Sequence, residues 1–249
     1  KSILSVHDLI KYEEKKGVNK LIYGIIWFWL PLKAANYVTV VSPYTKKQLQ
    51  KHFKVDSMKV RVINNYFIPL VKNTSKVDIN ANDRNNILVV GTKKRKNIIN
   101  LIKAINDIED VKLTIVGKVP KNEENLLIKN EIIYDSYFNL TEIELSKVYN
   151  EADILFFAST KEGFGLPILE AQSIGLPVIT SNTTAMPFVA GKGALIVDPY
   201  NIEEIKNAVL TLHNKIIRDE IIVEGYNNIK RFNKNDFINN YLQLYKSIE

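Results

Sequence analysis

Residues 152–170 read ADILFFASTKEGFGLPILE, and this stretch decides the predicted fold. The run 152–158 is short, continuous and apolar after its second residue, which is typical of a buried parallel strand. A loop with Gly163 and Gly165 follows, and the apolar residues from Leu166 onward begin a helix. Strand, glycine-bearing loop and helix, in this order, form the unit at which open α/β sheets bind phosphorylated ligands.

Two carboxylates bracket this loop. Glu162 lies before the predicted helix, and we place Glu170 about two turns into it. Carboxylates at this spacing can accept hydrogen bonds from both ends of an extended, polyhydroxylated ligand. Taken singly, they are equally consistent with a solvated loop residue and a partly exposed helix residue, because glycine loops are common.

The same alternation continues through the rest of the chain and predicts a doubly wound parallel sheet. Predicted strands lie at 87–91, 112–116, 131–134, 153–157, 177–180 and 194–197. Predicted helices lie between them at about 97–107, 121–129, 141–150, 166–174 and 184–189. After residue 201 the pattern is purely helical, with segments at 202–213, 215–229 and 234–247.

The first 69 residues predict a smaller sheet. Strands are expected at 2–6, 37–41 and 60–63, with helices at 18–35 and 43–53. Ser42 is expected to cap the second helix, because serine before a proline favours a helix start. A parallel strand such as the first needs neighbours on both sides, and these residues supply too few.

Composition sets limits on the class of protein. The 249 residues are 46% hydrophobic, carry a net charge of +7 and contain no cysteine, which excludes disulfides and thiolate metal sites. The excess positive charge favours anionic partners. The basic run 93–96 follows a strand and lacks interleaved aromatic residues, so it favours local phosphate binding and argues against a nucleic-acid partner.

The apolar run 21–32 has two interpretations. It is too short to span a bilayer. We favour a buried helix packed on the sheet, but its aromatic residues also suit a peripheral contact with a membrane interface. These aromatic residues are Tyr23, Trp27, Phe28 and Trp29.

The stretch 162–170 resembles the E-x7-E motif of the retaining family 4 glycosyltransferases, and the resemblance extends from Ser5 to the final helix. It implies an α/β fold of the GT-B type: a doubly wound parallel-sheet C-terminal Rossmann domain plus an incomplete N-terminal Rossmann domain. The implied domains are an acceptor-side remnant (1–69), a linker (70–86), a nucleotide-sugar domain (87–230) and a helix that crosses back to the N-terminal domain (231–249). The front of the N-terminal domain is not in this sequence, so we expect either a longer protein or a second chain that completes it.

The resemblance implies an enzyme that moves a hexose from a nucleotide sugar to a saccharide or lipid-linked acceptor with retention of configuration. It implies polysaccharide biosynthesis for the cell envelope, in the cytoplasm and at the inner face of the membrane in the family's commonest setting. No cofactor or metal is expected, and the sequence has no Asp-X-Asp motif. The main alternative is a non-catalytic or donor-binding subunit that needs another chain, and a nucleotide-sugar epimerase or phosphorylase is a more distant one.

The resemblance also assigns roles to residues. Glu162 would hold hydroxyls of the donor sugar and Glu170 the ribose, while Lys96 and Arg95 would contact the diphosphate and His7 would border the sugar. The catalytic residues it implies are Glu162, His7 and Lys96. The donor-binding residues it implies are Gly91, Thr92, Arg95, Lys96, Gly163, Phe164, Gly165, Leu166 and Glu170.

Overall fold

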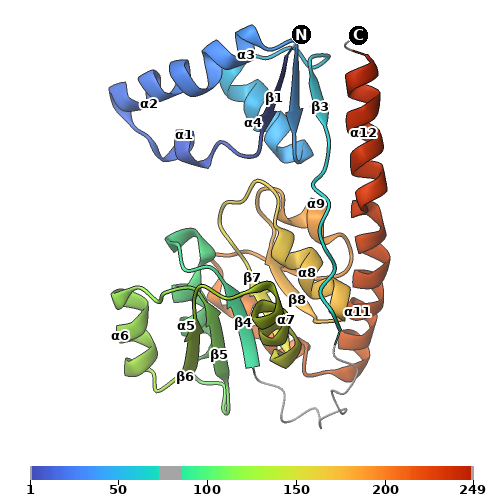
Figure 1. Cartoon of the computed structure of the whole chain (residues 1–249). Coiled ribbons are helices and arrows are strands. Elements are labelled where there is room, and N and C mark those ends of the chain that lie inside the picture. Colours follow the sequence, from blue (N-terminus) through green and yellow to red (C-terminus); the bar gives the residue numbers. More distant parts are fainter. Residues whose placement is uncertain (1, 73–85, 248–249) are drawn as a thin grey trace. The chain divides into compact units, whose positions relative to one another are not determined.

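The computed structural model describes residues 2–72 and 86–247 (Figure 1). Its contacts divide the described chain into two compact units. Unit 1 consists of residues 2–67, 161–165 and 232–247, and unit 2 of residues 68–72, 86–160 and 166–231. Most of the predicted linker 70–86 lies outside the described residues.

Unit 2 is built on a six-stranded sheet in the order β6-β5-β4-β7-β8-β9, and all neighbouring strands are parallel. The strands are β4 (Asn86–Val90), β5 (Lys112–Val116), β6 (Ile133–Tyr137), β7 (Ile154–Phe157), β8 (Val178–Ser181) and β9 (Leu195–Val197). From β4 the chain runs outward through β5 to β6, and then returns to β7 on the other side of β4. The strand order therefore reverses between β4 and β7, which is where ligands bind in open α/β sheets.

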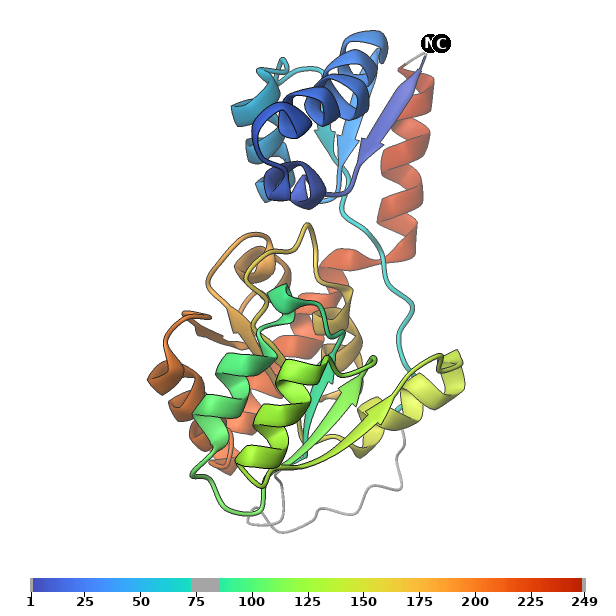
Figure 2. The ribbon, with the colours of Figure 1, turned by 90° about the vertical axis from the view of Figure 1, so that its left-hand side faces the viewer.

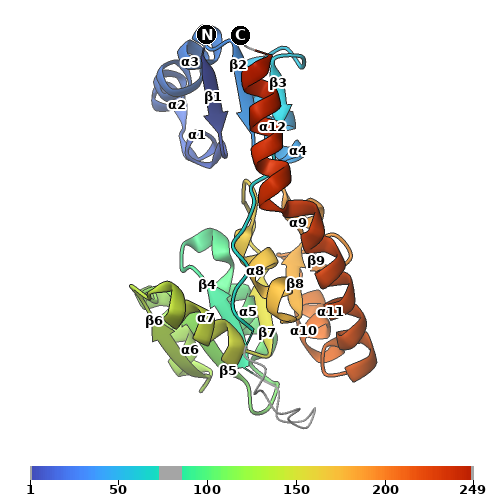
Figure 3. The same cartoon turned by 45° about the vertical axis from the view of Figure 1, so that its right-hand side comes forward.

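Helices cover both faces of this sheet. Figure 2 shows α5 and α6 in front of the sheet, and Figure 3 shows α7 and α8 on its opposite side. The helical elements of unit 2 are η3 (Lys94–Lys96), α5 (Ile98–Ile105), α6 (Lys121–Lys129), α7 (Glu142–Glu151), α8 (Leu166–Ile174), α9 (Met186–Ala190), α10 (Ile202–Thr211) and α11 (Lys215–Ile229). The turn η4 (Lys230–Phe232) lies where the chain passes from unit 2 to unit 1.

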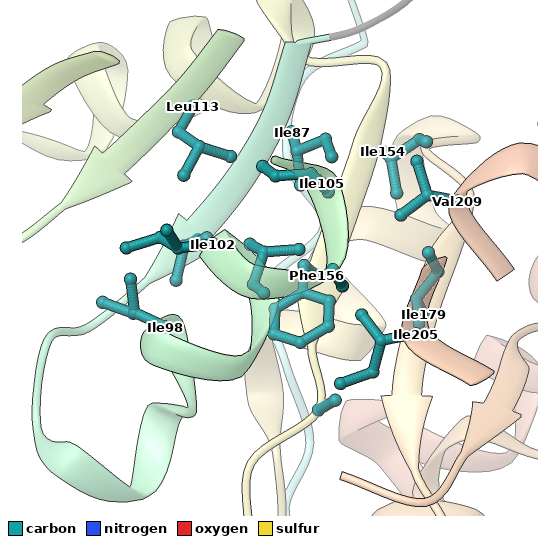
Figure 4. Packing of buried hydrophobic residues seen from close by; sticks show 14 of the residues in the cluster. Ile87, Ile98, Ile102, Ile105, Leu113, Ile154, Phe156, Ile179, Ile205 and Val209 are labelled. Carbon is teal, nitrogen blue, oxygen red and sulfur yellow. The ribbon is translucent and has the colours of Figure 1, made fainter. Parts of the chain in front are cut away.

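The core of unit 2 explains why its strands are continuously apolar. Ile87 and Phe156 are fully buried, and they pack with Ile102 of α5 and Val209 of α10 in one cluster (Figure 4). Because the opposite face is also covered by helices, Leu88 and Leu155 are equally buried. With both faces covered, every residue of the central strands β7 and β8 is buried.

Unit 1 has a three-stranded parallel sheet in the order β1-β2-β3. Its strands are β1 (Ile3–Val6), β2 (Tyr37–Val40) and β3 (Val60–Val62). Its helices are α1 (Ile10–Glu14), α2 (Gly17–Gly24), the π-helical turn η1 (Ile25–Trp29), α3 (Leu30–Ala34), α4 (Pro43–Phe53) and α12 (Lys234–Lys246). Within the described residues, β1 is paired with β2 alone.

Different side chains hold the two faces of the unit 1 sheet. On one face, Val38 and Val40 pack with Phe28 and Leu49 from the helices. On the other face, the Tyr241 hydroxyl of α12 lies 3.2 Å from the Thr39 hydroxyl and 3.5 Å from that of Ser5. Figure 1 shows this sheet between the helices α2–α4 and the helix α12.

Several element boundaries differ from the predicted ones. The strand expected at 131–134 is β6, shifted toward Tyr137, because Glu131 adopts a left-handed conformation (φ 55°) in the turn that ends α6. The helix expected at 184–189 begins at Met186, since Thr184 also has a positive φ (58°). The helix expected at 18–35 contains a π-helical turn, and the short α1 and η3 were not predicted.

Candidate functional site

The loops that follow β4 and β7 meet at the switch point of unit 2. The backbone N–H of Thr160 donates a hydrogen bond of 2.9 Å to the carbonyl oxygen of Arg95. This contact joins the basic loop 91–97 to the loop after β7. The basic loop is the predicted anion-binding segment, and the loop after β7 leads into the stretch with Glu162 and Glu170. The hydrogen bond at Thr160 therefore holds these two predicted segments together.

Lys96 lies across the ends of these two strands. Its Nζ is 4.1 Å from the centre of the Phe157 ring at the end of β7. Its stem passes over Gly91, where a Cβ would come within 2.9 Å of Lys96 Cε. Gly91 also has a φ of +89°, which side chains rarely adopt, so glycine at this position lets the lysine reach the strand ends.

The remainder of the basic loop is fixed by packing and by a tight turn. Thr92 packs on Gly117 at the end of β5, where a Cβ would come within 2.9 Å of the threonine methyl. The N–H of Lys96 donates to the Lys93 carbonyl at 2.7 Å, which closes the turn η3. Asn97, with a φ of +66°, donates its side-chain amide to the Pro199 carbonyl at 2.6 Å.

Glu170 is held from a neighbouring helix. It is the fifth residue of α8, so it lies just over one turn into the helix and not two. The hydroxyl of Tyr149, a fully buried residue of α7, donates a 2.6 Å hydrogen bond to Glu170 Oε2. Burial raises the pKa of the Glu170 carboxyl above its ordinary value, and the Tyr149 hydrogen bond partly opposes this rise.

Tyr149 is a site residue that the sequence did not reveal. Burial and the nearby Glu170 carboxylate raise the pKa of its hydroxyl well above the ordinary value, so it stays protonated and acts as a donor. A tyrosine in the sequence of α7 looks like any half-buried aromatic residue, and only the packing of α7 beside α8 gives it a partner.

In unit 1, Gly163 is clamped against the end of β1. A Cβ on Gly163 would collide with the carbonyl oxygen of His7, so only glycine fits here. The carbonyl of Gly163 accepts hydrogen bonds from the hydroxyl of Ser42 at 2.8 Å and from that of Thr45 at 3.3 Å. Ser42 caps α4 as predicted, and this second contact was not predicted.

The residues on either side extend this clamp. Lys161 Nζ lies 3.1 Å from Oε2 of Glu13, and Phe164 packs edge-to-face on Phe232 with ring centres 5.6 Å apart. Glu162 is half-buried between these two anchors. Gly165 follows with a φ of +120°, and the exposed Leu166 begins α8.

The predicted site residues thus fall into two groups. Unit 2 brings together Gly91, Thr92, Arg95 and Lys96 at the end of β4 and holds Leu166 and Glu170 on α8. Unit 1 brings together His7, Glu162, Gly163, Phe164 and Gly165. In the described parts of the chain, no three acidic or histidine side chains are placed to share a metal ion.

A sequence model of the family "Glycosyl transferases group 1" matches residues 71–231, well over half of the chain. The chain belongs to this family. The match contains the basic loop 91–97 and the stretch 162–170.

Among curated proteins, the O-antigen chain mannosyltransferase B of Escherichia coli is 35% identical over 104 residues, which cover 41% of this chain and 27% of that protein. The O-antigen chain mannosyltransferase RfbU of Salmonella typhimurium is 26% identical over 86% of this chain and 64% of its own length. This group 1 chain therefore matches about a quarter to two thirds of the length of these relatives.

Among solved structures, HepE from Anabaena in complex with UDP and glucose superposes with a TM-score of 0.83 at 17% identity, over 98% of this chain and 71% of that one. At this identity the likeness concerns the fold. Together with the two parallel sheets, it confirms the predicted α/β architecture of the GT-B type. Across residues 2–72 and 86–247, no helix combines the length and apolar character needed to traverse a bilayer.

Proposed function

We propose that this chain binds a nucleotide-sugar donor and belongs to a retaining glycosyltransferase that moves a hexose to a saccharide or lipid-linked acceptor. The observation that carries the proposal is the position of Lys96, whose ammonium group lies at the switch point of the unit 2 sheet. A cation held there, in a member of this family, suits the diphosphate of a nucleotide sugar.

The nucleotide end of the donor would be bound by unit 2. Lys96 and Arg95 would neutralise the diphosphate, and the N-terminus of α8 would add backbone N–H donors. Glu170, steadied by Tyr149, would accept hydrogen bonds from the ribose hydroxyls. Gly91 would let the phosphates approach the backbone closely.

The transfer step would retain the configuration at the anomeric carbon. The acceptor oxygen forms its bond to that carbon on the face that the diphosphate leaves, and the bond from carbon to phosphate oxygen breaks. The acceptor proton passes to the departing phosphate oxygen, so no separate protein base is needed. Positive charge on Lys96 stabilises the leaving group as its negative charge develops.

Glu162 and His7 are the remaining catalytic residues of the proposal. Glu162 would hold sugar hydroxyls and stabilise the positive charge that develops at the anomeric carbon. The clamp on Gly163 supports this role, because it fixes the backbone next to Glu162 by two hydroxyl donors. The names of the O-antigen relatives favour mannose as the hexose and a cell-envelope polysaccharide as the product.

Calorimetry of nucleoside diphosphate binding tests the proposal. We expect UDP or GDP to bind the chain in the presence of a metal chelator. Lys96→Ala should weaken binding by about 10–100-fold, the range for a lost hydrogen bond to a charged group. Lys94→Ala is the matched control, since Lys94 is the exposed neighbour in the same turn and should change affinity by less than about threefold.

Two results would overturn the donor site. One is an absence of binding by either nucleotide in the correctly folded chain. The other is binding that Lys96→Ala and Lys94→Ala weaken equally, because general positive charge would then explain the affinity.

A further inference from the structure

Residues 70–72, the described start of the predicted linker, belong to unit 2 and bind three of its helices. We call these three residues the strap. Figure 3 shows this part of the chain running past α8 and α7. These are the two helices that carry Glu170 and its partner Tyr149. The contacts of the strap therefore bear on the predicted ribose ligand.

On α8 the strap is held by Ser173. The Ser173 hydroxyl accepts a 3.2 Å hydrogen bond from the backbone N–H of Leu70. The same hydroxyl donates a 2.7 Å hydrogen bond to the carbonyl oxygen of Glu170, nearly one turn earlier in the helix. A serine hydroxyl has a single proton to donate, so these two contacts together fix its orientation. Ser173 thus joins the strap to the backbone of Glu170.

On α7 the strap is held by two side chains about one turn apart. The side-chain amide of Asn150 donates a 2.9 Å hydrogen bond to the carbonyl oxygen of Val71, and the Ser146 hydroxyl donates to the same oxygen at 3.3 Å. Residues four apart lie on one side of a helix, so one carbonyl of the strap binds one side of α7. Asn150 directly follows Tyr149, whose hydroxyl binds the Glu170 carboxylate.

A third contact joins the strap to α11. Lys72 Nζ donates a 2.9 Å hydrogen bond to the hydroxyl of Tyr226 and lies 5.5 Å from the centre of that ring. The Tyr226 hydroxyl packs at the end of α8, because a Cβ on Gly175 would collide with it. Consecutive residues of the strap are therefore bonded to three different helices, which fixes its path across unit 2.

The contacts with α7 and α8 close a ring of hydrogen bonds. The ring leads from Asn150 through Val71 and Leu70 to Ser173. It returns from Ser173 through Glu170 and the Tyr149 hydroxyl to α7. Contacts in one network support one another, so the loss of one link loosens the others. The ring therefore couples the strap to the orientation of the Glu170 carboxylate, which Tyr149 holds through Oε2.

We propose that Ser173 is a positioning residue for Glu170: through the strap it keeps α7 against α8, so that Tyr149 holds the Glu170 carboxylate ready for a ribose. This inference rests on the proposed function, because the ribose is that of the nucleotide-sugar donor. A carboxylate that is ordered before the ligand arrives loses less side-chain freedom on binding. The competing interpretation is that Ser173 only fastens the strap.

Calorimetry with UDP and with its 2′,3′-dideoxy analogue separates these interpretations, and the GDP pair is measured in the same way. The analogue keeps the base and the diphosphate but lacks the hydroxyls that Glu170 would bind. We expect Ser173→Ala to weaken UDP binding by about 2–10-fold, the cost of ordering one flexible side chain on binding. Binding of the analogue should change by less than about 1.5-fold.

Two further variants sharpen this comparison. Asn150→Ala breaks the ring from the side of α7 and should discriminate between the two ligands in the same direction as Ser173→Ala. Thr211→Ala is the matched control. The Thr211 hydroxyl of α10 donates a 2.7 Å hydrogen bond to the Asn207 carbonyl, a bond within one helix like that of Ser173, but outside the ring. It should leave the binding of both ligands unchanged.

Two results of the calorimetry would overturn the positioning role. Equal weakening of UDP and of the analogue by Ser173→Ala would mean that the serine only supports the fold. Unchanged UDP binding would mean that Glu170 is oriented without it.

Urea unfolding tests the ring without a nucleotide and so separates this inference from the proposed function. If Ser173 acts through Tyr149, the midpoint of the Ser173→Ala, Tyr149→Phe double variant should fall by less than the sum of the two single shifts. Additive shifts would overturn the ring even where UDP binds. Absence of nucleotide binding by the unchanged chain would overturn the proposed function and the ribose role together, while a non-additive midpoint would still support the positioning of the carboxylate.

Discussion

Lys96 in unit 2 and Lys33 in unit 1 both lie over aromatic rings, but in contrasting surroundings. The Phe157 ring under Lys96 is 2% exposed and ends a central strand, whereas the Trp29 ring beside Lys33 is 47% exposed at the end of the helical turn η1. A cation on a buried ring at a switch point is presented to one small anion.

The difference reflects how completely each sheet is enclosed. In unit 2 helices cover both faces of the sheet, and most apolar side chains of the central strands are buried in the core. In unit 1 the helices bury one stripe and leave another exposed. This difference supports the proposal that unit 2 recognises a single ligand at its switch point.

The largest expected effect distinguishes the enclosed core of unit 2 from the exposed helical turn η1 of unit 1. Phe156→Ala should lower the free energy of unfolding by about 3–5 kcal/mol, because it empties a fully enclosed position. Trp27→Ala should change it by no more than about 0.5 kcal/mol, since that ring is mostly solvated. Urea unfolding followed by far-UV circular dichroism measures both, and a comparable loss in the two variants would mean that Trp27 is covered in solution.

The next effect concerns the support of Glu170. Tyr149→Phe removes a buried hydrogen bond to a carboxylate and should cost about 1.5–3 kcal/mol at neutral pH. The folded-state pKa of Glu170 lies above that of the unfolded chain, so the folded state binds more protons between the two values. Stability therefore falls as the pH rises through this window.

Removal of the Tyr149 hydroxyl should raise the pKa of Glu170 further and so widen the window. Glu170→Gln should abolish this part of the pH dependence. Urea unfolding at a series of pH values measures both variants. Identical pH profiles for Tyr149→Phe and the unchanged protein would contradict the assigned hydrogen bond.

A smaller effect tests the clamp in unit 1. Gly163→Ala forces a Cβ against the His7 carbonyl and should cost about 1–3 kcal/mol, as overpacking does. Gly17→Ala is the matched control, because its Cβ would meet nothing and only its φ of +54° is unfavourable, at about 1 kcal/mol. Thermal unfolding followed by tryptophan fluorescence reports on unit 1, which holds both tryptophans. A smaller shift for Gly163→Ala than for Gly17→Ala would argue against the clamp.

The smallest expected effect is at a surface ion pair of unit 2. Lys112 Nζ lies 2.6 Å from Asp135 Oδ2, but both side chains are 44% exposed. Lys112→Ala should therefore cost no more than about 1 kcal/mol, and high salt should remove the difference. A larger, salt-resistant loss in urea unfolding would show that this edge of the sheet is more enclosed than its exposure indicates.

The sequence predicted the fold well where local pattern and tertiary structure agree. Continuous apolar runs such as 153–157 predicted buried strands, because both faces of the unit 2 sheet are covered. The prediction found β6 but placed its bounds too early, because Asp135 and Ser136 of this edge strand face partly to solvent and interrupt the apolar pattern. It failed for the turn η3, which has no apolar periodicity to detect.

The site was predicted only in part. Motif spacing identified Lys96, Glu162 and Glu170 as candidates, and their roles remain predictions. The contacts that fix the site could not be found, because Tyr149 reaches Glu170, and Thr45 reaches the carbonyl of Gly163, through the packing of separate helices. The membrane-like composition of 21–32 was visible, but only the structure separates the buried Phe28 from the exposed Trp27 and Trp29.

Hydrogen–deuterium exchange with and without a saturating nucleoside diphosphate tests the central claim most directly, because it maps binding onto both units at once. We predict slower exchange of backbone amides at 91–97 and 166–171, around Lys96 and Glu170, and no change at 18–30 in unit 1. Unchanged exchange at both unit 2 segments, or protection confined to 18–30, would contradict the assignment of the donor site to the switch point.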